Sequence, residues 1–324
     1  MKPATALAAF LLCLGGLLAP AWAGQHAEES KACIKCHDAE DLPDMSRSAH
    51  AAAADARTPG CVTCHGVSPT HVNKPSGVKE RPRPDRVFTK GTATPASERN
   101  ATCLGCHQKD AKRALWGGSQ HETADVTCSS CHKVHTNHDK VLTKTTQTDT
   151  CITCHKEQRA QLAKPSHHPV PEGKMGCSDC HNVHGSAGPK LAKRDSVNAT
   201  CYTCHAEKRG PFVHSHEPVG EDCATCHNPH GSNVASMLKS RPPMLCQQCH
   251  TPHVAGGVGA VGGQRGVFPP AVFPGQLSSA ITNTTGGKNV VNIWQGRSCL
   301  NCHTQVHGSN NPSTTNPSPK FLMR

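Results

Sequence analysis

The chain has 324 residues, with 34 lysines and arginines against 23 aspartates and glutamates, and only 3% of its residues are aromatic. It also contains 28 glycines and 25 prolines, and its hydrophobic fraction is 35%. Such a chain cannot offset its conformational entropy with a hydrophobic core of its own, which excludes an ordinary globular domain and leaves one held by disulfides or a bound cofactor.

The first 23 residues have the features of a secretory signal peptide. Lys2 is followed by the apolar stretch 7–18 and by the small-residue pattern that ends at Ala23. The stretch is too short to span a bilayer as an ordinary helix, and the residues before Cys13 lack the small residue of a lipoprotein processing site. We therefore expect a signal peptide at 1–23 that is cleaved with Cys13, leaving an exported domain, 24–324, with no transmembrane helix of its own.

All cysteines but Cys13 belong to ten copies of the motif Cys-x-x-Cys-His. The cysteine pairs are Cys33/Cys36, Cys61/Cys64, Cys103/Cys106, Cys128/Cys131, Cys151/Cys154, Cys177/Cys180, Cys201/Cys204, Cys223/Cys226, Cys246/Cys249 and Cys299/Cys302. The histidines that follow them are His37, His65, His107, His132, His155, His181, His205, His227, His250 and His303.

This motif is the attachment signature of c-type haem. Two thiols three positions apart can form thioethers at one edge of the porphyrin, and the adjoining histidine can ligate the iron. A single Cys-x-x-Cys is more often a zinc half-site, a redox pair or a disulfide, but neither zinc nor a disulfide requires a histidine directly after the second cysteine. Ten copies predict ten covalently attached haem c groups, with the motif histidines as proximal iron ligands.

Ten further histidines follow a regular pattern and are candidates for the distal iron ligands. One lies between the two motifs of each successive motif pair and one after the second motif. They are His50, His71, His121, His135, His168, His184, His216, His230, His253 and His307. Four histidines fall outside this pattern and are expected at the surface or beside a ligand, although His167 could exchange roles with His168. These four are His26, His138, His167 and His214.

The motifs repeat in five two-haem units, as the parallel between NATCLGCH at 100–107 and NATCYTCH at 198–205 indicates. The units span about 33–71, 103–135, 151–184, 201–230 and 246–307. His132 and His135 would share one side of a helical turn, so His135 must serve another iron than that of His132. The simplest hypothesis is that, within a unit, the trailing histidine serves the first haem and the middle one the second.

Short gaps between motifs leave little room for regular structure, so we predict a multihaem cytochrome c fold that is mostly coil with short helices and negligible β-structure. The turn Asn228-Pro229-His230-Gly231-Ser232 is one expected connection. Two insertions interrupt the rhythm. Residues 66–100 are Pro-rich and predict an extended linker or wrapping loop. Residues 254–297 predict either a mobile surface loop or an apolar segment that docks on another protein.

The basic surplus could indicate nucleic acid binding. Export and haem attachment argue against nucleic acid, because ten haems would add about twenty propionate charges, which the lysines and arginines can balance.

Three segments resemble the MtrA/DmsE/PioA family of periplasmic decahaem cytochromes: CYTCHAEKRGP at 201–211, LCQQCH at 245–250 and GRSCLNCHTQVHGSN at 296–310. The resemblance extends over essentially the whole mature chain. It implies an elongated haem wire inserted in an outer-membrane β-barrel of the MtrB type, which passes electrons between periplasmic carriers and a cell-surface cytochrome or an extracellular mineral. The segment 254–297 is longer than in iron-reducing members, and the long N-terminal extension of PioA-type members is absent, so the direction of electron flow stays open.

The expected function is an electron-transfer conduit without a substrate site of its own, because ten distal candidates for ten haems leave no open iron. Ligation by two histidines also predicts low potentials. One alternative is a soluble periplasmic electron shuttle without a barrel. Another is a multihaem reductase, which needs an iron with an exchangeable position.

Overall fold

The computed structural model describes residues 30–37, 42–52, 55, 57–89, 91–250, 299–301 and 303–310. The expected signal peptide, His26, His253, Cys302 and the insertion 254–297 lie outside the described residues. The chain divides into two compact units, Met1–Thr143 and Lys144–Arg324.

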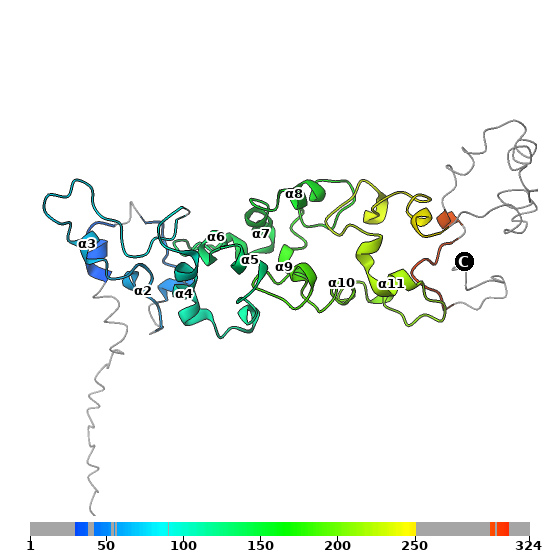
Figure 1. Cartoon of the computed structure of the whole chain (residues 1–324), viewed down its shortest axis with the longest axis horizontal. Helices are drawn as coiled ribbons and strands as arrows, with labels where there is room; N and C mark the ends of the chain where they lie inside the picture. The colour runs from blue at the N-terminus through cyan, green and yellow to red at the C-terminus, as the bar shows by residue number, and fades with distance from the viewer. Residues whose placement is uncertain are drawn as a thin grey trace, which may run out of the picture. The chain divides into compact units, whose positions relative to one another are not determined.

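Both units consist of short helices joined by turns and coil (Figure 1). In Met1–Thr143 the elements are η1 (Ala49–Ala51), α2 (Cys61–His65), α3 (Pro69–Val72), α4 (Ala96–His107), η2 (Ala111–Arg113), α5 (Gln120–Thr123), α6 (Cys128–Cys131) and η3 (Lys140–Leu142). In Lys144–Arg324 they are α7 (Lys144–Cys151), α8 (Lys156–Leu162), α9 (Cys177–Cys180), η4 (Pro189–Leu191), α10 (Val197–Cys201), η5 (Ala206–Lys208), α11 (Glu217–Glu221), η6 (Cys223–Thr225), η7 (Ala235–Met237), η8 (Cys246–Gln248) and η9 (Cys299–Asn301). The part of the chain that the structure describes contains isolated β-bridges but no named strand, which confirms the predicted fold class.

Helices form where the motifs lie, because one helical turn brings two cysteines three positions apart to the same side. Helix α2 contains a complete motif, and α6 and α9 each run from the first to the second cysteine. These two helices end before the motif histidine, since His132 and His181 have extended backbones with ψ of 134° and 143°. The expectation that His132 and His135 share a helical turn is therefore wrong.

Buried apolar side chains are scarce. Among the described residues, the buried hydrophobic ones are Trp116, Leu162, Leu191 and Ala192. Burial of so few apolar side chains cannot balance the entropy of ordering chains of this length. The fold therefore depends on apolar surface that the polypeptide does not itself supply.

Two loops of the same construction follow motifs at 181–193 and 227–239. In each, the backbone N–H of the asparagine after the motif histidine donates a hydrogen bond across the loop, from Asn182 to the Leu191 carbonyl and from Asn228 to the Met237 carbonyl. A backbone bridge joins the second loop to residues before it, at Ser166 and Ser232. The predicted turn at 228–232 is present and is closed by a hydrogen bond from Gly231 N–H to the Asn228 carbonyl.

Gly231 lets this second loop approach its neighbour closely. Its φ is +142°, and a Cβ atom there would collide with the backbone carbonyl of Gln161. A side chain at this position would push the loop away from the 161–168 segment, which carries His168.

Candidate haem sites

The cysteines of neighbouring motifs lie against one another. In each predicted two-haem unit, the thiols of the first cysteines of the two motifs are joined by a side-chain hydrogen bond. These pairs are Cys33–Cys61, Cys103–Cys128, Cys151–Cys177, Cys201–Cys223 and Cys246–Cys299. The contact with Cys103 lowers the pKa of Cys128 to about 7, and the contact with Cys151 lowers that of Cys177 to about 6. The edges at which the two haems of a unit attach are therefore adjacent.

Successive two-haem units also approach through their cysteines. The thiol of Cys64 interacts electrostatically with Cys103, that of Cys180 with Cys201, and that of Cys226 with Cys249. Within each of the two compact units, neighbouring motifs in the sequence are thus neighbours in space.

Six of the described second cysteines are exposed, whereas the first cysteines of the same motifs are half-buried. The exposed ones are Cys36, Cys106, Cys154, Cys180, Cys204 and Cys249. The thiols of Cys154 and Cys204 accept from the hydroxyl of the threonine that precedes each of them, at 3.8 and 3.9 Å.

The polypeptide packs motif against motif through the first cysteines, which leaves these six second cysteines at the surface. An attached porphyrin would supply the apolar edge that covers such a thiol. The assignment of the motif cysteines as thioether residues stays a prediction that rests on the motif.

Histidine rings face one another in pairs, and each pair joins a motif histidine to a distal candidate. Within the described residues of the two units, the pairs are His37–His71, His107–His50, His65–His135, His205–His168, His181–His230, His250–His216 and His227–His307. Their ring centres are 5.9 to 6.2 Å apart.

This separation fits one iron atom between the two rings. A metal–imidazole nitrogen bond is about 2 Å long, and each ligating nitrogen is about one ångström from its ring centre, so two axial rings stand about 6 Å apart. The polypeptide thus holds two rings at the spacing that a six-coordinate haem iron requires.

These ring pairs correct the hypothesis that both haems of a two-haem unit take their distal histidines from that same unit. His50, a middle histidine, faces His107 of the next unit, and His135, a trailing histidine, faces His65 of the preceding one. The same forward and backward exchange recurs in the pairs His168–His205 and His181–His230, and again in His216–His250 and His227–His307. The within-unit scheme holds only for the pair His37–His71, among those the structure gives.

The physical reason is the reach of the chain. A histidine a few residues after a motif cannot pass around the edge of the porphyrin to its opposite face. It can ligate the iron of the neighbouring unit, against which its loop packs. The first two-haem unit has no earlier motif before it in this sequence. The ring of its trailing histidine, His71, faces His37 of the same unit.

Hydrogen bonds at Nδ1 fix the tautomer of six of these rings. Each Nδ1 lies 2.7–3.1 Å from a backbone carbonyl oxygen, which can only accept a hydrogen bond. The contacts are His65 to Arg86, His71 to Pro82, His168 to Pro229, His181 to Lys190, His216 to Val306 and His227 to Ser236. With the proton on Nδ1, the Nε2 lone pair is free to bind a metal.

Burial favours the neutral form of several rings. It lowers the pKa values of His135, His230 and His307, helped by the nearby rings of His65 and His181 and by the ammonium of Lys208, respectively. A neutral imidazole is the form that ligates iron, so these side chains need not lose a proton first at neutral pH.

Two of the four histidines outside the ligand pattern, His167 and His138, contact groups other than a motif histidine. His167 lies 2.5 Å from the Lys164 carbonyl and 3.0 Å from the Glu172 carboxylate, so the neighbouring ring of His168 is the one that faces His205. His138 contacts the Thr143 hydroxyl.

Two buried asparagines that the sequence analysis did not identify hold the second motif of a unit against the first. The Cys128 N–H donates to Asn100 Oδ1 at 2.9 Å, while Asn100 Nδ2 donates to the Val126 carbonyl. Asn198 makes the equivalent contact with Cys223 N–H at 2.7 Å. The repeated letters NATC before the two motifs were the signal that could have found them.

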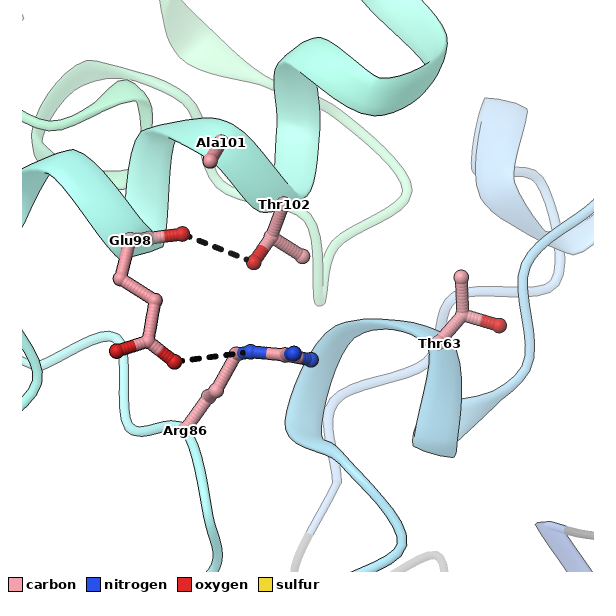
Figure 2. A pocket seen from close by; sticks show the side chains of 5 residues that line it. All are labelled: Thr63, Arg86, Glu98, Ala101 and Thr102. Atoms are coloured by element: carbon pink, nitrogen blue, oxygen red, sulfur yellow. Dashed lines mark hydrogen bonds and ion pairs between the residues drawn. The ribbon is translucent and has the colours of Figure 1, made fainter.

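A surface pocket between α2 and α4 is lined by Thr63, Arg86, Glu98, Ala101 and Thr102 (Figure 2). Arg86, from the insertion 66–100, forms an ion pair with Glu98 at 3.1 Å. The insertion also meets the motif helix through two contacts of Arg86 with His65, by its N–H and by its carbonyl oxygen. It therefore packs on the haem motif of α2.

No helix in the described ranges is long and apolar enough to cross a membrane.

Comparison with known proteins identifies the class of protein. The family model described as "Doubled CXXCH motif" matches residues 167–210 and 216–255, and the model "Cytochrome c-type protein NrfB-like" matches residues 61–146. Together with the paired histidines, these matches define a multihaem c-type cytochrome, an electron-transfer protein that carries covalently attached haem c, ten by the number of its motifs.

The chain is 43% identical over 289 residues to the multiheme cytochrome MtrA of Shewanella baltica, a match that covers 87% of this chain and 78% of that protein. It therefore belongs to the MtrA family of multihaem cytochromes. The cytochrome c-type protein NrfB of Escherichia coli is 29% identical over 140 residues, 42% of this chain and 70% of NrfB.

Proposed function

We propose that the ten motif cysteine pairs hold the haems by thioether bonds, with the motif histidines as proximal ligands and the ten patterned histidines as distal ligands. The seven ring pairs of 5.9–6.2 Å support this assignment. Adjacent two-haem units exchange histidines, the middle one going forward and the trailing one back. Each such exchange makes two haem sites depend on two units at once.

The function that this arrangement supports best is a conduit that carries electrons from haem to haem. Bound haem iron supplies one-electron redox chemistry. The protein contributes a fixed order of attachment sites, with adjacent cysteines at successive motifs, and a histidine on both faces of each iron. Histidines on both faces leave no position for a small substrate, which distinguishes a conduit from a multihaem reductase.

The family and the expected signal peptide support a proposal for where the conduit lies. We assign it to the periplasm, associated with the outer membrane, where it accepts or donates electrons to periplasmic cytochromes on one side. On the other side it serves extracellular cytochromes or mineral, from within an outer-membrane β-barrel of the MtrB type. Metal reduction and iron oxidation use the same chain of haems in opposite directions.

The test is electron transfer across a sealed bilayer. Outer membranes would be extracted with mild detergent, and haem staining of a small sample would identify the fraction that holds the complex. The unstained complex would then be placed in liposomes loaded with reduced methyl viologen. The proposal predicts that external ferric citrate oxidises the enclosed dye when the complex is present, and that the cytochrome added without a barrel gives no oxidation. Recovery of all the cytochrome in the soluble periplasmic fraction, with no barrel attached, would instead support a soluble shuttle.

A further inference from the structure

The Nδ1 contact of the motif histidine His132 differs in kind from those given for other motif histidines. His132 Nδ1 lies 2.7 Å from Oδ2 of Asp139, a carboxylate rather than a backbone carbonyl. Where the structure gives hydrogen bonds at Nδ1 of other motif histidines, at His65, His181 and His227, the acceptor is a main-chain carbonyl. Glu207 is 3.8 Å from His205 Nδ1, which is beyond hydrogen-bonding distance.

The carboxylate of Asp139 is held in place for this contact. Its Oδ1 accepts from Lys133 N–H at 3.3 Å and from Val141 N–H at 3.4 Å, the latter as the N-cap of η3. Its side chain is only 13% exposed, so water screens it poorly. Two backbone amides thus fix one oxygen and leave the other directed at the ring.

We propose that Asp139 is a positioning and potential-setting residue, which gives His132 histidinate character and makes the haem at Cys128 and Cys131 more difficult to reduce than haems whose motif histidine donates to a carbonyl. This inference rests on the proposed role of His132 as an iron ligand. A carboxylate accepts the Nδ1 proton more strongly than a carbonyl does, which raises the basicity of Nε2. A more basic ligand and a nearby negative charge both stabilise ferric over ferrous iron.

The redox step itself is one electron. An electrode or the preceding carrier supplies it, ferric iron becomes ferrous, and no bond to iron is made or broken. The Nδ1 proton stays in the hydrogen bond between His132 and Asp139. Asp139 therefore acts on the equilibrium of this single step, and the Met1–Thr143 unit gains a haem that electrons occupy less readily than its neighbours.

The experiment is a spectroelectrochemical titration of the purified ten-haem protein and its variants. Asp139→Asn removes the charge, and Asp139→Ser removes the carboxylate while keeping a residue that caps helices well. Asp110→Asn is the matched control, because Asp110 caps η2 through Lys112 N–H in the same way and bonds to Arg113. We expect each Asp139 variant to change the ferric/ferrous equilibrium of one haem in ten by at least about tenfold, a rise of about 59 mV for one electron.

Magnetic circular dichroism in the near infrared provides a second readout that a purely structural cap would not move. One haem of the native protein should show its charge-transfer band at the energy of histidinate ligation, and both Asp139 variants should return it to the position of the others. If the Asp139 variants keep the native haem potentials but melt at a lower temperature, Asp139 is only a helix cap and the proposal is wrong. An equal shift in Asp110→Asn would show a general charge effect.

If the variants fail to mature, the native spectrum decides, since absence of the histidinate band contradicts the proposal. A barrel-free cytochrome would leave this titration unaffected.

Discussion

At the scale of single residues, the ring pairs differ in the angle between their planes. His50 and His107 are nearly perpendicular, at 89°, whereas the planes of His37 and His71 differ by 10° and those of His227 and His307 by 15°. Parallel rings donate to the same iron d orbital and separate it from its partner, and perpendicular rings leave the two nearly equal in energy. The paramagnetic spectrum of each haem therefore reports which rings it holds.

Replacing His50 by alanine should remove the most anisotropic low-spin signal from the electron paramagnetic resonance spectrum of the oxidised protein. It should also open one iron in ten to cyanide, because His50 is the proposed distal ligand at Cys103 and Cys106. His138→Ala is the control, since His138 lies outside the ligand set, and it should leave the spectrum unchanged. Loss of an ordinary rhombic signal in the His50 variant would contradict the assignment.

At the scale of elements, the buried asparagines tie the second motif of a two-haem unit to the helix in which the first motif begins. Asn198, on α10, accepts from the Cys223 N–H and donates to the carbonyls of Val219 and Gly220. The Asn198 side chain is buried, so its own polar atoms depend on these three hydrogen bonds. This clamp fixes how closely the two attachment sites of the unit approach.

Asn198→Ala should therefore destabilise the haem-loaded protein by about 1–3 kcal/mol, because it removes the three hydrogen bonds of this side chain. Asn198→Asp, which keeps the acceptor but loses the donor, should be intermediate. The measurement is the chemical denaturation midpoint, with the exposed Asn73→Ala as a control expected within about 0.5 kcal/mol of the native protein. A fully stable Asn198→Ala variant would remove the clamp from the account.

The sequence predicted the short helices better than it predicted which histidine faces which. The motif spacing predicted short helices without strands and the ten distal candidates, because both depend on residues close together in the chain. The exchange of His50 and His135 between units depends on how loops pack across a porphyrin, which local spacing does not specify. Asp139 belongs to no recognisable motif, and the proposal for it depends on the contact between its carboxylate and His132 in the structure.

At the scale of the whole molecule, the polypeptide supplies attachment sites and hydrogen bonds but little apolar interior. The described residues bury few hydrophobic side chains, and the flat faces of the haems can provide the missing surface. Folding and cofactor attachment are then one process, as in small domains that fold only around their metal.

A chain produced without haem attachment should accordingly remain unfolded. We expect it to lack a cooperative thermal transition by far-ultraviolet circular dichroism and to be digested by trypsin much faster than the haem-loaded protein. The loaded protein is the control in both assays. A cooperative transition in the haem-free chain would show that the polypeptide has a core of its own.

The central claim is that every iron is closed by two histidines, and low-temperature electron paramagnetic resonance of the fully oxidised protein, with haem content measured on the same sample, tests it most directly. The account predicts ten haems per chain, all low-spin and unresponsive to nitrite or cyanide. A stoichiometric high-spin signal that shifts when these small ligands are added would contradict it, because one iron would then be open to a substrate.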